Sequence, residues 1–308
     1  MALRDTIRSL TAQHLGVGYS VLGQTLTAVG FVGNTVPDDA RVTELPCSDV
    51  SNGGVAVGHA LAGKRPIYII RYQGFSWLNA AFIVNYAAKS KALWGKPCPM
   101  LIRGIAMEGS IGPVAGSSHH SLYYRMPGVS IYSPMTPNEY TQSYQEFMRG
   151  DDVVYLSEHR GAYDNNDELL DIYNTHPDIV LFPISITRFA AMEAAIELAE
   201  SGVSVAVHHV FHVKPFMPSE TALASLSRSK YGGMVLDDDY RDGIAKSLAH
   251  DLSEATGAAM TTMGLDDRTA GFYRDNLPPS KEQIIKRVRQ LCRPRLVGRV
   301  SAGPWKIA

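Results

Sequence analysis

Cysteine is scarce in this chain of 308 residues. The three that are present, Cys47, Cys98 and Cys292, form no CxxC pair and have no spacing typical of a metal site. A sparse and odd number of cysteines favours a reducing compartment. Residues 1–22 also lack the long apolar core of a signal peptide, so we predict a cytoplasmic protein.

An excess of charge of one sign and long apolar runs are missing as well. The net charge is −1, which gives no electrostatic reason to expect binding to nucleic acid or to an anionic membrane. No apolar run reaches the ~18 residues that a membrane span needs. We therefore predict neither a nucleic-acid partner nor a membrane.

Short apolar runs alternate with helical patterns along the chain, which is typical of parallel sheets covered by helices. Hydrophobic residues make up 45% and charged residues 19%, an ordinary globular balance, and the length suggests two domains. Helices are predicted at residues 51–61 and 78–91. The strands predicted in the first half lie at residues 19–22, 67–71, 100–103, 129–132 and 153–157.

A polar, turn-forming stretch at residues 159–177 is interpreted as a linker between the two predicted domains. The sequence thus predicts an α/β fold with a first domain at residues 1–175 and a second at residues 176–308, both with largely parallel sheets. The elements predicted after the linker include a strand at 179–184 and helices at 188–201 and 281–292.

A series of motifs runs through residues 41–158. These are LPCSD at 45–49, GGVAVGHALAGKRPI at 53–67, NYAAK at 85–89, PMLIRG at 99–104, SHHS at 118–121 and MPGVSIYSP at 126–134. In that order and at those spacings, the chain resembles the beta subunit of the decarboxylase component of 2-oxoacid dehydrogenase complexes and, more loosely, the C-terminal half of transketolase. The resemblance implies a transketolase-like pyrimidine-binding domain followed by a transketolase C-terminal-like domain. Because no catalytic constellation appears in the second domain, we predict that it serves assembly.

In that family, a carboxylate activates thiamine diphosphate. Its hydrogen bond to N1′ of the aminopyrimidine favours the imino tautomer, which removes the proton from C2 of the thiazolium ring. The resemblance places Asp49 in this role, where the family has a glutamate. Because aspartate is shorter by on the order of 1.5 Å, either the backbone lies closer to the ring, or a water bridges the gap, or activation is impaired. The alternative is that Ser48 or Asp49 is an ordinary helix N-cap.

Four more residues are expected near the cofactor. Phe75 matches the aromatic residue that stacks on the aminopyrimidine, and a core phenylalanine is the alternative. Gln24 stands where the family often has a glutamate, so it keeps hydrogen bonding without the charge, unless it is a plain loop residue. Arg71 falls at a contact where the family commonly has an apolar residue. Cys47 lies within the LPCSD motif, directly beside the predicted carboxylate.

Two adjacent histidines, His119 and His120, lie where the family places an active-site histidine that faces the substrate and moves protons. The transketolase-like register favours His119, whereas the following Ser121 favours His120, so both are candidates. The segment from this pair to Pro127 is shorter than in the family by about one helical turn. The wall of the substrate pocket is therefore expected to differ from that of the family.

The residues that would bind the diphosphate of the cofactor are missing from this chain. The family uses Mg²⁺ on a Gly-Asp-Gly…Asn-Asn segment, which does not occur here at the required spacing, and a GxxxxGK[ST] loop is also absent. We therefore expect an alpha-type subunit that carries Mg²⁺ and the diphosphate in an α2β2 assembly. The acidic run Asp237, Asp238 and Asp239 is interpreted as structural or as a subunit contact rather than as a metal site.

Three functions are compatible with this sequence. The first is removal of CO₂ from a 2-oxoacid and transfer of the acyl or aldehyde unit, with a lipoyl-carrier acyltransferase as a possible acceptor. The second is a split transketolase-like enzyme that transfers ketol units or forms carbon–carbon bonds, which Asp49, Arg71 and the shortened histidine segment favour. The third is a non-catalytic partner subunit, for which aspartate in place of glutamate is the support.

Overall fold

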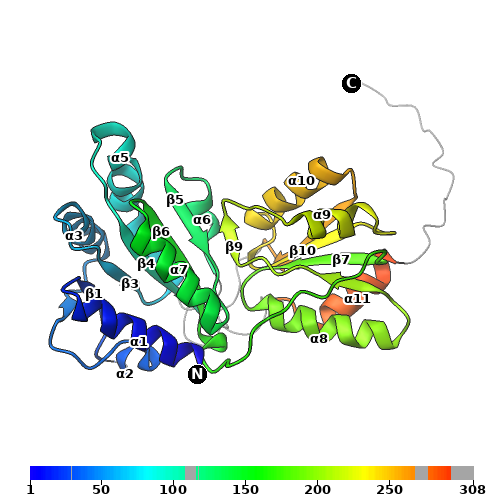
Figure 1. The fold of residues 1–308 in the computed structure, drawn as a ribbon, viewed down its shortest axis with the longest axis horizontal. Coiled ribbons are helices and arrows are strands. Elements are labelled where there is room, and N and C mark those ends of the chain that lie inside the picture. The colour runs from blue at the N-terminus through cyan, green and yellow to red at the C-terminus, as the bar shows by residue number, and fades with distance from the viewer. Residues whose placement is uncertain (29, 108–115, 117, 268–276, 293–308) are drawn as a thin grey trace.

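The computed structural model describes residues 1–28, 30–107, 116, 118–267 and 277–292. Two open sheets, each with helices on both faces, lie side by side (Figure 1). The predicted α/β fold with largely parallel sheets is confirmed. None of the helices in the described ranges is long and apolar enough to cross a membrane.

The first sheet has seven strands in the order β2-β1-β3-β4-β6-β5-β9. Neighbouring strands are parallel except for β9, which runs antiparallel to β5. Every residue of β3, β4 and β6 is buried, as expected for parallel strands covered on both faces. The strands are β1 (Val21–Gln24), β2 (Val42–Leu45), β3 (Ile67–Ile70), β4 (Met100–Ala106), β5 (Val129–Tyr132), β6 (Val153–His159) and β9 (His212–Lys214).

Alternate residues of these strands pack against different helices. Ile67 and Ile69 of β3 share a core with apolar residues of α1 and α7, whereas Tyr68 and Ile70 share another with α3. This alternation places α1 and α7 on one face and α3 on the other. The helices of the first half are α1 (Leu3–Gly16), α2 (Gly30–Asn34), α3 (Asp49–Leu61), α4 (Ser76–Phe82), α5 (Ala88–Trp94), α6 (Ser121–Tyr124) and α7 (Pro137–Arg149).

The second sheet has four parallel strands in the order β11-β10-β7-β8. Helices α8 and α11 cover one face of it, and α9 and α10 cover the other (Figure 1). Its strands are β7 (Ile179–Pro183), β8 (Val205–Val207), β10 (Gly233–Tyr240) and β11 (Met260–Leu265). Its helices are α8 (Thr187–Glu200), α9 (Glu220–Ser227), α10 (Ile244–Thr256) and α11 (Lys281–Leu291).

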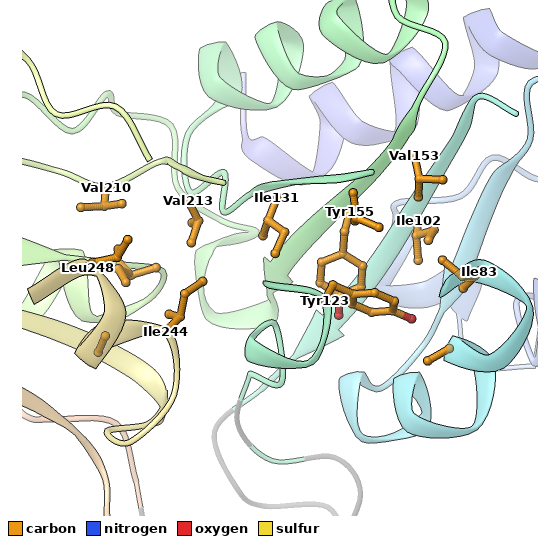
Figure 2. Packing of buried hydrophobic residues seen from close by; sticks show 14 of the residues in the cluster. Ile83, Ile102, Tyr123, Ile131, Val153, Tyr155, Val210, Val213, Ile244 and Leu248 are labelled. Carbon is orange, nitrogen blue, oxygen red and sulfur yellow. The ribbon is translucent and has the colours of Figure 1, made fainter. Parts of the chain in front are cut away.

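One hydrophobic core joins the two halves of the chain. Figure 2 shows Val213, Ile244 and Leu248 of the second half facing Ile131 and Tyr155 of the first. The strand β9, which belongs to the second half by sequence, also completes the edge of the first sheet. The two halves are therefore packed together through a continuous apolar interface, and the boundary at residues 175 and 176 stays a prediction.

Several predicted elements differ from the observed ones in their limits. The helix predicted at residues 51–61 begins at Asp49. The helix predicted at residues 78–91 is three pieces, α4, a π-helical stretch at Ile83–Ala87, and α5. The linker begins later than predicted, because β6 continues to His159.

Candidate functional site

The predicted cofactor residues lie at the carboxyl-terminal edge of the first sheet. Gln24 is the last residue of β1, Asp49 follows β2 as the first residue of α3, and Arg71 directly follows β3. In open parallel sheets, ligands bind outside this edge, because the strand ends and the helix starts that follow them meet there. The fold therefore brings residues from three separate segments to one place that suits a ligand.

The side chain of Asp49 is held by two amide groups. Gln24 donates from Nε2 to Oδ1 at 2.8 Å, and Asn79 donates from Nδ2 to the same oxygen at 3.0 Å. Asp49 is half-buried, and none of the described residues donates to its Oδ2. The carboxylate is thus oriented by uncharged donors through one oxygen, while the other oxygen is left available for a ligand.

Asn79 was not predicted from the sequence, although it organises this site. Its Nδ2 also donates to the carbonyl of Phe75 at 3.0 Å, and its Oδ1 accepts a hydrogen bond from the hydroxyl of Tyr68. Burial, and then the nearby Asp49, raise the pKa of Tyr68, so the phenol stays a neutral donor. The available signal was an amide side chain one helical turn after Phe75, between Leu78 and Ala80.

Glycine at position 53 allows α3 to approach α4 at this point. A Cβ atom on Gly53 would lie 2.9 Å from the carbonyl oxygen of Asn79, closer than real side chains pack. Ser48 is the N-cap residue of α3, as the alternative predicted, although its side chain forms no capping hydrogen bond. Asp49 is the first residue of the helix, and its carboxylate bonds to side chains. Cys47, one residue before Ser48, is an exposed free thiol.

Phe75 and Arg71 lie in the segment that follows β3, at the same end of the sheet as Asp49, but their side chains have different surroundings. Phe75 ends a short 3-10 turn, Gln73–Phe75, and its partly buried ring packs against the core shared by the two halves. The guanidinium of Arg71 lies 4.9 Å from the ring centre of Tyr72 and donates to the Tyr72 hydroxyl at 2.9 Å. Arg71 is therefore engaged with its neighbour in the chain.

The structure separates the two adjacent histidines. His120 is fully buried, and its Nδ1 and Nε2 lie 2.9 Å from Ser157 Oγ and 3.0 Å from Asp237 Oδ2. Burial lowers the pKa of His120, but the carboxylate of Asp237 outweighs it and raises the pKa to about 9. Because both ring nitrogens are used, His120 is poorly suited to bind a substrate.

His119 has a different environment from its neighbour. Its imidazole lies edge-on to Trp77, with the ring centres 6.5 Å apart, and no described residue forms a hydrogen bond with the ring. Its backbone N–H donates to Gln73 Oε1 at 2.6 Å, and burial lowers the pKa of the imidazole. Of the two histidines, His119 has the side chain that is free to act on a ligand.

Asp237 and Asp238 lie at the carboxyl end of β10 and face the histidine pair. The ligand atoms of His120, Asp237 and Asp238 are within 4.8 Å of one another, a spacing that could hold a cation. Among the described residues, no other set of three or more His, Cys, Asp or Glu side chains has this spacing. His120 and Asp237 are already bonded to each other here, and Ser118 donates to Asp238 at 2.7 Å. These contacts agree with the interpretation of the acidic run as structural.

Known proteins share this fold and these segments. Residues 13–165 match the family model described as transketolase, pyrimidine binding domain. The chain is 27% identical over 239 residues to 2-oxoisovalerate dehydrogenase subunit beta of Bacillus subtilis (strain 168), with 70% of each chain covered. It is 24% identical over 281 residues to pyruvate dehydrogenase E1 component subunit beta of Chaetosphaeridium globosum, which covers 83% of this chain and 84% of the relative.

A solved structure supports the fold over nearly the whole chain. It is described as "Split gene transketolase, inactive beta4 tetramer" and matches with a TM-score of 0.71. The match covers 95% of this chain and 98% of that chain at 16% identity. At this identity, the likeness shows that the two chains share an architecture.

Proposed function

We propose that this chain is the cofactor-activating subunit of a thiamine-diphosphate enzyme. The reason is that the chain belongs to the transketolase-like pyrimidine-binding family, which includes the beta subunits of 2-oxoacid dehydrogenases. The reaction is the decarboxylation of a 2-oxoacid followed by transfer of the acyl or aldehyde unit. The observation that carries this proposal is the half-buried carboxylate of Asp49, which two amides orient at the ligand-binding edge of the first sheet.

The residues at this edge fit the aminopyrimidine part of the cofactor. When bound, thiamine diphosphate supplies a carbon nucleophile for attack on the carbonyl of a 2-oxoacid. Asp49 would accept a hydrogen bond from N1′–H through Oδ2, the oxygen that the amides of Gln24 and Asn79 leave available. Phe75 would offer a flat apolar contact to the ring, and His119 would hold or move a proton on the substrate.

The shorter side chain of Asp49 is compatible with this role. Gln24 and Asn79 hold the carboxylate in one orientation, and neither carries a positive charge that would neutralise it. Tyr68 fixes the amide of Asn79 in turn. Preorganised donors of this kind reduce the loss of side-chain freedom on binding.

A partner subunit is proposed to hold Mg²⁺ and the diphosphate. Next to the candidate site, Trp77 is 61% exposed and Leu78 is 50% exposed, and Tyr86, Leu93 and Trp94 are exposed farther along the same helices. Exposed apolar and aromatic side chains that gather in this way are typical of a surface that another protein covers. We propose an alpha-type partner in an α2β2 assembly located in the cytoplasm, with a lipoyl-carrier acyltransferase as the acyl acceptor.

The first experiment is a calorimetric titration of thiamine diphosphate with Mg²⁺ into this chain, alone and mixed with a candidate alpha-type subunit from the same organism. Binding in the mixture alone is expected, because the diphosphate ligands are proposed to come from the partner. Tight binding to the lone chain would show that this chain holds the diphosphate itself. Absence of binding in both samples would favour a non-catalytic subunit.

The role of Asp49 is tested by Asp49→Ala in the reconstituted enzyme. We expect kcat for 2-oxoacid decarboxylation to fall by about 10²–10⁴-fold, the usual contribution of a positioned acid–base group. The matched control is Asp152→Ala, an exposed aspartate just before β6 at the opposite end of the sheet. Full activity of Asp49→Ala would contradict the proposal, and ketol transfer without CO₂ release would identify the split transketolase-like enzyme instead.

A further inference from the structure

The strand β10 ends in three consecutive buried carboxylates, called here the β10 carboxylates: Asp237, Asp238 and Asp239. Successive side chains of a regular strand point to opposite faces. The pairing of β10 with β11 shifts its register between Leu236 and Tyr240. Within this irregular stretch, all three carboxylates reach the same neighbour, residues 118–121, called here the histidine segment.

Each of the β10 carboxylates binds a different residue of the histidine segment. His119 is the one residue of the segment to which no β10 carboxylate is hydrogen-bonded in the described structure. The second sheet therefore holds the segment on both sides of His119. The three contacts are Ser118 Oγ to Asp238 Oδ2 at 2.7 Å, His120 Nε2 to Asp237 Oδ2 at 3.0 Å, and the Ser121 N–H to Asp239 Oδ2 at 3.0 Å.

The same segment is tied to the first sheet through buried polar groups. His120 Nδ1 lies 2.9 Å from Ser157 Oγ on β6, and Gln73 Nε2 donates to that hydroxyl at 2.8 Å. Gln73 Oε1 accepts the backbone N–H of His119 at 2.6 Å. Gln73 belongs to the turn that ends at Phe75, so the network connects the second sheet to the predicted cofactor edge.

A close contact with α10 adds to this attachment. Ser121 Oγ accepts the N–H of Ile244, the first residue of α10, at 3.0 Å. A Cβ atom on Gly243 would lie 2.3 Å from the same oxygen, so glycine is needed for this approach. The histidine segment is thus fixed to the second half by backbone geometry as well as by charge.

We propose that the β10 carboxylates are positioning residues for His119, so that the second half of the chain takes part in building the active site as well as in assembly. Burying a carboxylate is unfavourable by several kcal/mol unless its partners compensate. All three β10 carboxylates hydrogen-bond to the segment that carries His119, as expected if they keep the His119 side chain in one position. This inference rests on the proposed function of His119.

The test is a double-mutant cycle in the reconstituted enzyme with His119→Ala and Asp237→Asn. If Asp237 acts through His119, Asp237→Asn lowers kcat by about 10–100-fold in the parent, the effect of a misplacement near 1 Å. In the His119→Ala background, it then lowers kcat less than about twofold, because coupled residues are not additive. An equal loss in both backgrounds, or no loss in the parent, would overturn the inference.

Two further measurements make the cycle decisive. The rate at which diethyl pyrocarbonate modifies His119, followed by mass spectrometry, is expected to change in Asp237→Asn and to stay unchanged in the exposed control Asp242→Asn. Asp239→Asn, which loses a bond to one backbone N–H, repeats the cycle if Asp237→Asn does not fold. An unchanged modification rate in the Asp237 and Asp239 variants would count against the inference.

Calorimetry separates a failure of this inference from a failure of the proposed function. Thiamine diphosphate with Mg²⁺ is expected to bind the Asp237→Asn enzyme within about threefold of the parent Kd, a difference below 1 kcal/mol, because the Asp49 site is intact. If the parent enzyme binds no cofactor, or if His119→Ala is fully active, the proposed function is wrong. If the parent enzyme binds the cofactor and His119→Ala loses activity, but Asp237→Asn is without effect, only the positioning role is wrong.

Discussion

The carboxyl ends of the two sheets carry aspartates in very different surroundings. Asp49, at the edge of the first sheet, is half-buried and is bound by two amides through a single oxygen. Asp237 and Asp238, at the edge of the second, are fully buried and bind hydroxyl and imidazole groups of the histidine segment. The same side chain is available for a ligand in one region and used for structure in the other.

The charges around the aspartates also differ between the two regions. Burial and the charge of Asp237 raise the pKa of Asp238 to about 7, while the carboxylate of Asp237 raises the pKa of His120 to about 9. Because these groups are buried away from water, their charges act strongly on one another. The amides around Asp49 bring no charge, so the charge of that carboxylate can act on a ligand. Partner type and access to water, rather than acidity itself, therefore distinguish a carboxylate that is available to a ligand from one that anchors a segment.

The largest effect expected from this comparison is on stability. Asp237→Leu leaves the imidazolium of His120 without its partner, and breaking a buried ion pair in this way destabilises a protein by about 3–5 kcal/mol. Asp49→Ala removes hydrogen bonds at a half-buried site and is expected to lower the free energy of unfolding by about 1 kcal/mol. Urea unfolding of both variants, followed by circular dichroism, measures the difference. Equal losses would show that the two regions do not differ as described.

The sequence was sufficient to predict which segments meet at the carboxyl-terminal edge of the first sheet. The motifs placed Gln24, Asp49 and Phe75 near one another, and strand ends in a parallel sheet do bring such segments together. It was not sufficient to choose between His119 and His120. That difference depends on Asp237, which lies 117 residues from His120 in the sequence, and local patterns carry no information about such a partner.

The elements that were missed have similar physical explanations. The π-helical stretch at Ile83–Ala87 interrupts a predicted helix without a proline or glycine to mark it. β9 has three residues and pairs with β5 of the other half, so its place in the first sheet is decided by packing. In the sequence, Asn79 is an ordinary polar residue, and only the structure shows its hydrogen bonds with Tyr68 and Asp49. For β9 and Asn79, the deciding contacts are with residues distant in the sequence.

His14, a buried histidine of the first half, differs from His120 in how its protonation affects stability. His14 donates from Nε2 to the carbonyl of Arg65 at 2.8 Å, and in the neutral ring its Nδ1 accepts from the hydroxyl of Tyr144 at 3.0 Å. The ring packs beside Tyr19 and Phe147. Burial lowers its pKa to about 4, and the Arg65 guanidinium acts in the same direction. Unlike His120, it has no carboxylate partner among the described residues, so its neutral form is the stable one.

The folded state therefore binds a proton at His14 less readily than the unfolded state does. The stability that His14 contributes is present above pH 6.5 and is lost as the pH falls toward about 4, by at most about 3 kcal/mol. His14→Gln should reduce the steepness of this acid loss, as measured by urea unfolding at pH 7 and pH 4.5. Identical pH profiles for the parent and the variant would contradict the assignment.

The smallest expected effect comes from an aspartate just beyond the β10 carboxylates. Asp242 forms exposed ion pairs with Lys246 and Arg241, and such pairs are screened by water and salt. Asp242→Ala should leave the urea midpoint, the decarboxylation rate and the modification rate of His119 unchanged. A clear loss in this variant would mean that negative charge near the end of β10, rather than the buried contacts of Asp237, Asp238 and Asp239, supports the histidine segment. The histidine segment would then depend on the number of carboxylates near it more than on their positions. The contrast between these anchoring carboxylates and Asp49 would have to be explained by net charge.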